Sequence, residues 1–76
     1  MTPDELAAHL EKEAAFYYQL AEKYRELAAA KDRGEYGDSA QTKSIRITAE
    51  AGVRLHQALG DWATWAESHQ PNAPEN

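Results

Sequence analysis

The stretch that decides the fold is residues 3–31, PDELAAHLEKEAAFYYQLAEKYRELAAAK, which has no Gly and no Pro after its first position. Its large apolar side chains recur at steps of three and four residues, as they do along one side of an α-helix. These residues are Leu6, Leu10, Tyr17, Leu20, Tyr24 and Leu27. Beside them a small residue recurs every seven positions, at Ala7, Ala14, Ala21 and Ala28. The stretch predicts a long amphipathic helix that a second helix approaches closely.

Start and stop signals bound this helix. Thr2 is a suitable N-cap, Pro3 occupies the first helical position and Glu5 completes a capping box. Gly34 follows as a residue that readily adopts the left-handed conformation that ends many helices. The first helix is therefore expected to begin at Pro3 and to end just before Gly34.

The whole chain divides into two helical halves and a short tail. We expect a first helix over about 3–32, a loop over 33–38 and a second helix over about 39–69. With no strand partner anywhere, the chain is predicted to be all-α, an antiparallel two-helix hairpin over 1–70. Residues 71–76 contain Pro and no apolar side chain larger than Ala, which is typical of a disordered tail.

The second helix carries apolar residues on two faces, whereas one hairpin partner covers a single face. One set is expected to face the first helix: Ile45, Ala49, Gly52, His56, Leu59, Ala63 and Ala66. The other set would then lie in water: Ile47, Ala51, Leu55, Ala58, Trp62 and Trp65. An exposed patch of that kind usually marks an interface. We therefore predict contacts between chains at Ile47, Leu55, Leu59, Trp62 and Trp65. The simplest assembly is a four-helix bundle dimer, with a higher oligomer as the alternative.

Composition limits the possible functions. The chain has 76 residues, so its core is small, and without Cys it has neither a disulfide nor a thiolate metal site to stabilise it. Oligomerisation is the remaining way to stabilise such a core. A formal charge of −5 argues against a protein that coats nucleic acid. We find no signal peptide and no apolar run long enough for a membrane span, so we expect a cytoplasmic protein without membrane contact.

No motif of an enzyme rises above chance in the sequence. His56 lies among apolar positions, and a catalytic histidine would need an orienting carboxylate and a nucleophile nearby. We therefore predict no catalytic residues and no cofactor. The favoured function is a small non-enzymatic helical interaction protein, an adaptor, regulator or inhibitor that binds a larger protein. We expect a bacterial protein, with a phage or a mobile element as the alternative source.

An alternative function is capture of a small anionic ligand, such as a nucleotide, between subunits. Lys43, Arg46 and Arg54 are the cations of the second helix, and Tyr17 and Tyr24 offer rings on which a base stacks. Neither a Gly-rich phosphate loop nor an excess of positive charge accompanies them, so this function ranks second.

A metal-binding function ranks third. Glu5, His9 and Glu13 recur at steps of four on one face, a spacing at which carboxylates and imidazole can hold a divalent ion. The segment 13–17, EAAFY, with Leu-Ala at 20–21, resembles the first helix of ferritin-like carboxylate proteins. That resemblance implies a metal site that also uses Glu-x-x-His pairs, and this sequence has no such pair. We therefore predict no metal site.

Overall fold

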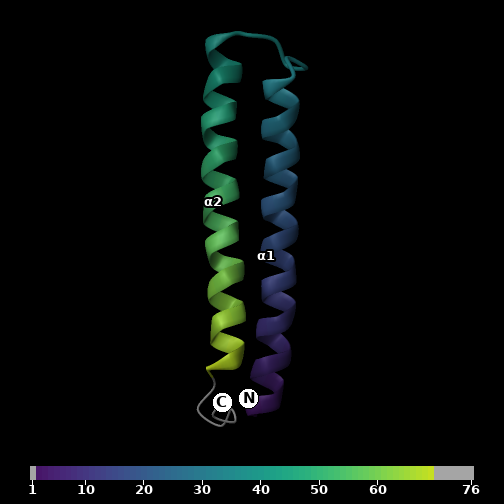
Figure 1. Cartoon of the computed structure of the whole chain (residues 1–76), viewed down its shortest axis with the longest axis vertical. Helices are drawn as coiled ribbons and strands as arrows, with labels where there is room; N and C mark the ends of the chain where they lie inside the picture. The colour runs from purple at the N-terminus through teal and green to yellow at the C-terminus, as the bar shows by residue number, and fades with distance from the viewer. Residues whose placement is uncertain (1, 70–76) are drawn as a thin grey trace.

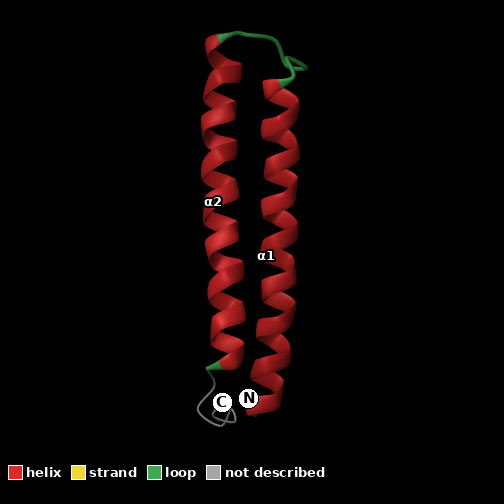
Figure 2. Ribbon diagram, in the orientation of Figure 1, coloured by secondary structure: helices red, strands yellow, loops and turns green. Residues whose placement is uncertain are grey.

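The computed structural model describes residues 2–69, which form two helices running antiparallel along their full length (Figure 1). Helix α1 spans Pro3–Asp32 and helix α2 spans Ala40–Ser68, and the described part of the chain contains no strand (Figure 2). The predicted all-α hairpin is confirmed. The tail expected at 71–76 lies outside the described residues. Neither helix in the described range is long and apolar enough to cross a membrane.

Both helices start at hydroxyl caps. The Thr2 hydroxyl accepts a hydrogen bond from the Glu5 amide at 3.1 Å, and Pro3 follows the cap as expected. At the start of α2 the Ser39 hydroxyl accepts a hydrogen bond from the Thr42 amide at 3.2 Å. Each cap satisfies an amide that the first helical turn leaves without an intrahelical partner. The two helix starts are therefore specified locally by the sequence.

The end of α1 is closed by a glycine in the left-handed region. Gly34 has φ +84°, and its amide donates to the carbonyl of Lys31 at 3.0 Å. The amide of the next residue, Glu35, donates back to the carbonyl of Ala30 at 3.2 Å. This pair of bonds is a Schellman motif, which satisfies carbonyls at the helix end and turns the chain away. Gly37, with φ +81°, completes the turn toward α2.

The two helices meet along a line of small residues. The buried positions on this line are Ala14, Ala21 and Ala28 of α1 and Ala49, Gly52, Gly60 and Ala63 of α2. Leu10 is the one large side chain in the core of the described chain. The larger residues of the α1 pattern, such as Leu20 and Leu27, are only half-buried beside the line. Helices approach most closely where side chains are smallest, so the alanine repeat takes the centre of the contact.

Two tyrosines of α1 lie over two glycines of α2. A Cβ atom added to Gly52 would stand 2.5 Å from two ring carbons of Tyr24, and one added to Gly60 would stand 2.6 Å from the ring of Tyr18. Any larger residue at either glycine would push the ring away. These two contacts fix the position of α2 along α1. The Tyr18 hydroxyl also donates a hydrogen bond of 2.7 Å to the Asp61 carboxylate.

Polar side chains join the helices at further points. The Nε of Arg46, in the first half of α2, donates to the Asp32 carboxylate at the end of α1, at 3.1 Å. Near the middle of the hairpin, Arg25 of α1 donates to the side-chain oxygen of Gln57 of α2. The exposed ion pair between Arg46 and Asp32 adds little to stability, yet both contacts agree with the register set by the tyrosines.

Candidate functional site

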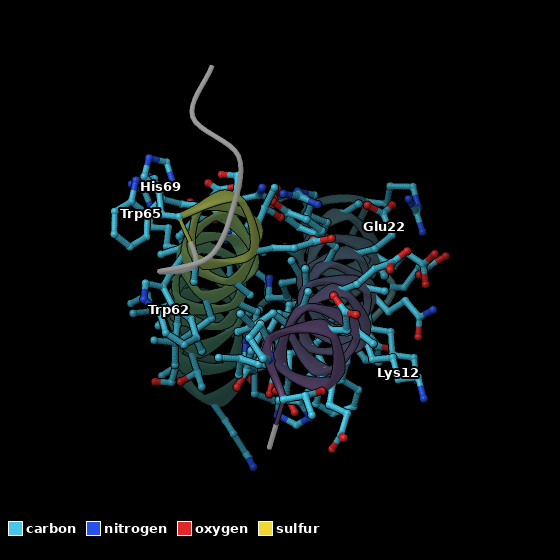
Figure 3. All side chains as sticks on the ribbon, turned by 90° about the horizontal axis from the view of Figure 1, so that it is seen from below. Lys12, Glu22, Trp62, Trp65 and His69 are labelled. Carbon is cyan, nitrogen blue, oxygen red and sulfur yellow. The ribbon has the colours of Figure 1, made fainter. Side chains whose placement is uncertain are left out.

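The most prominent surface feature is an apolar stripe on the side of α2 that faces away from α1. We call it the tryptophan stripe, and its members are Ile47, Ala51, Leu55, Ala58, Trp62 and Trp65. Ile47 is 73% exposed, Trp65 57% and Trp62 52%. Viewed along the hairpin axis, Trp62 and Trp65 lie on the side of α2 opposite to α1 (Figure 3). Side chains of this size in water are what a docking surface provides.

Four of the five predicted interface residues lie on this stripe, and the fifth does not. Leu55, 57% exposed, belongs with Ile47 and the two indoles. Leu59 is half-buried, because its position turns it partly toward α1. Their participation in a contact between chains stays a prediction. The structure establishes that four large side chains are available for such a contact.

The stripe continues to the last turn of α2 through a stacked ring pair. The ring centroids of Trp65 and His69 lie 4.4 Å apart with an angle of 17° between the planes. The imidazole is held by a 2.8 Å hydrogen bond that its Nδ1 donates to the carbonyl of Trp65. The labelled rings gather on one side of α2 in Figure 3. The imidazole therefore lies against one face of the exposed indole.

The cations predicted to bind an anionic ligand already have carboxylate partners. Glu50 accepts from Arg46 Nη1 and from Arg54 Nε, each at 3.0 Å, and Lys43 lies 3.7 Å from the Asp38 carboxylate. The hydrogen bond from Arg46, followed by that from Arg54, lowers the pKa of Glu50 below its ordinary value of 4.5. The bond to Glu50 likewise raises the pKa of Arg46. An incoming anion would have to compete with these carboxylates.

The two predicted ligand tyrosines gather around His56 instead. Tyr24 stacks on the imidazole with centroids 5.3 Å apart, and the ring of Tyr17 lies 6.4 Å from it. His56 Nδ1 donates to the carbonyl of Gly52 at 2.7 Å. A hydrogen bond to Glu13 raises the pKa of Tyr17 above 10.0. These contacts place the tyrosines and the cations in separate clusters, and ligand binding by the five residues together stays a prediction.

The weak metal candidates do not form a cluster. His9 Nε2 lies 3.5 Å from a Glu13 oxygen, and Glu5 is exposed one turn away. Across residues 2–69, no group of three or more acidic or histidine side chains is arranged to hold a metal ion.

One exposed surface was not singled out by the sequence patterns. It lies on α1, and we call it the lysine-lined face: Lys12, Phe16, Leu20, Lys23, Leu27 and Lys31. Phe16 is 55% exposed, and the spacing of apolar residues in α1 did not predict whether it would be buried or exposed. The sequence contains a pattern that could have predicted this face: successive members are three or four residues apart, and they include every lysine of α1.

These features define an all-helical hairpin with large apolar surfaces turned outward. A family model described as "Virulence activator alpha C-term" matches residues 1–69, and the chain belongs to this family. Membership of this family indicates a regulatory helical protein. Searches among curated proteins and among solved structures found no match.

Proposed function

We propose that this chain is a regulatory module that acts by protein association: it forms a dimer through the tryptophan stripe, and the dimer binds a larger protein. The observation that carries the proposal is the exposure of Ile47, Leu55, Trp62 and Trp65 on one side of α2. Burying a side chain of Leu size is worth about 1.5–3 kcal/mol, and whole domains are stable by only about 5–15 kcal/mol. A surface of four such side chains gives a strong drive to association.

The distribution of charge along α2 favours a second copy as the first partner. Lys43, Arg46 and Arg54 lie in its first half with Glu50 as the one carboxylate among them, and the acidic Asp61 and Glu67 lie in its second half. When two copies of α2 pair antiparallel about a two-fold axis, the positive half of each lies beside the negative half of the other. The charges therefore complement one another in this arrangement.

Shape supports the same arrangement. Ala51 lies between Ile47 and Leu55, and Ala58 lies between Leu55 and Trp62, so small side chains alternate with large ones along the stripe. In an antiparallel pair the large side chains of one copy can pack over the small side chains of the other, as knobs pack into holes in helix bundles. Membership of a regulator family agrees with a function exerted through contacts rather than through catalysis.

Sedimentation equilibrium tests the dimer. Wild type is expected to sediment as a dimer at micromolar concentration, and Leu55→Asp as a monomer, because a carboxylate cannot be buried in the interface without a partner. Trp65→Ala removes an exposed indole only, so it should fold and should weaken the dimer about tenfold or more, equivalent to about 1.4 kcal/mol. Gln19→Ala, on the polar side of α1, is the matched control and should leave the dimer unchanged.

A folded, monomeric wild type would refute the self-association. Equal association constants for wild type and Trp65→Ala would refute the assignment to the stripe. Far-UV circular dichroism on each variant shows whether the helices persist, so that loss of association is not confused with unfolding.

A further inference from the structure

The lysine-lined face of α1 differs from the tryptophan stripe in both place and chemistry. Phe16 lies one turn after Lys12 and is more than half exposed, and Leu20 and Leu27 are half-buried further along the face. Lys12 and Lys23 are exposed and Lys31 is half-buried. Figure 3 shows Lys12 on the side of α1 away from α2. The face is therefore open along its length and does not share the outward side of α2.

Charge is segregated around α1. Among the described residues no ion pair involves Lys12, Lys23 or Lys31, whereas most cations of the chain have a carboxylate partner. The acidic side chains Glu11, Glu22 and Glu26 occupy the neighbouring side of α1, and Glu13, which lies 3.5 Å from His9, is a further carboxylate between Lys12 and Lys31. In Figure 3, the side chains of Glu22 and Lys12 project in different directions from α1. This face is locally positive although the chain as a whole carries −5.

We propose that the lysine-lined face binds an acidic amphipathic helix of the larger protein. The apolar centre, Phe16, Leu20 and Leu27, would receive side chains spaced three and four residues apart, and the three lysines would pair with carboxylates at the edges of the incoming helix. The face extends from Lys12 to Lys31, roughly 28 Å at 1.5 Å per residue, which matches a helix of about five turns. This proposal rests on the proposed function, which has the chain bind a larger protein, and it specifies the part of that protein that binds.

Other occupants fit this face less well. A second copy of the same face would place lysine against lysine, which disfavours self-pairing. A nucleic acid backbone would pair with the lysines and leave Phe16 and the two leucines unused. An anionic membrane is flat and broad, so it would also approach the glutamates beside the face, which anionic lipid repels. A single acidic helix is narrow enough to contact the lysines and the apolar centre alone.

The test uses the full chain and a synthetic peptide of about five helical turns, with Leu at core-facing positions and Glu at both edges. Titration calorimetry should show binding that weakens as salt rises, because exposed charges take part. Lys12→Glu combined with Lys23→Glu should weaken binding at least tenfold, and Phe16→Ala several-fold. Lys43→Glu, the same charge reversal on α2, is the matched control and should bind as wild type does. Circular dichroism verifies that each variant remains helical.

The proposal is overturned if the peptide does not bind wild type, or if the two lysine replacements leave binding unchanged. It is also overturned if phosphatidylserine vesicles or duplex DNA bind with the same dependence on Lys12 and Lys23 while the peptide does not. Sedimentation of the same variants separates this surface from the tryptophan stripe. The variant with both Lys12→Glu and Lys23→Glu should remain a dimer, and Trp65→Ala should keep its affinity for the peptide. A monomeric wild type that binds the peptide would refute the dimer and leave this proposal standing.

Discussion

Replacement of Gly52 by Ala is expected to destabilise the hairpin, although the same change in an ordinary helix stabilises it. Alanine improves helix propensity by about 1 kcal/mol. At this position, however, the new Cβ would lie 2.5 Å from two ring carbons of Tyr24 and 2.8 Å from a third. Those atoms are close to the root of the side chain, and the ring is stacked on His56, so it has little room to yield. Overpacking of this kind costs about 1–3 kcal/mol.

The two effects together predict a net loss of up to about 2 kcal/mol for Gly52→Ala. The midpoint of thermal unfolding should fall by about 4–8 °C for each kcal/mol in a chain of this size. Circular dichroism melts should be compared at one protein concentration, because association adds to apparent stability. Ala15→Gly, at an exposed position of α1, measures the helix-propensity effect in this protein and should destabilise it by about 1 kcal/mol.

A double-mutant cycle isolates the clash itself. When Tyr24→Ala has already removed the ring, Gly52→Ala should become stabilising by about 1 kcal/mol, so the sign of the effect reverses. A rise in the melting temperature for Gly52→Ala in the wild-type background would refute the reasoning. An equal effect in both backgrounds would refute it as well, because the ring would then play no part.

Two further predictions concern polar contacts between and within the helices. Since Arg46 lowers the pKa of Glu50, the folded chain binds fewer protons at this carboxylate than the unfolded chain does near pH 4. The stability of wild type should therefore fall as the pH drops below about 4.5. In thermal melts from about pH 6 to pH 3, the melting temperature of Glu50→Gln should decline less than that of wild type. Tyr18→Phe should lose the hydrogen bond from the Tyr18 hydroxyl to Asp61 and its 3.4 Å contact with Thr64, at a cost of about 0.5–1 kcal/mol. Tyr18→Ala also removes the ring that packs over Gly60, so chemical denaturation should show a larger loss of stability. Equal losses for the two tyrosine variants would contradict the second prediction.

Much of the fold follows from local signals in the sequence. The capping residues Thr2 and Ser39 and the glycine at position 34 act within a few residues of themselves, and the structure shows each of them engaged at a helix end. The two apolar faces of α2 also follow from periodicity, because a helix places residues three and four apart on one side whatever lies nearby. Such features require no knowledge of a partner, so one sequence suffices to predict them.

The line of contact between the helices was decided only by the tertiary structure. Periodicity finds both the row of large side chains and the alanine repeat of α1, but it does not say which of them lies against α2. That choice depends on how closely two backbones can approach, and therefore on Gly52 and Gly60 of the other helix, which receive the rings of Tyr24 and Tyr18. The exposure of Phe16 has the same origin, since it follows from the rotation of α1 once the alanines occupy the contact. Local pattern thus determined the helices and their possible faces, and packing across the hairpin selected which faces remain open to partners.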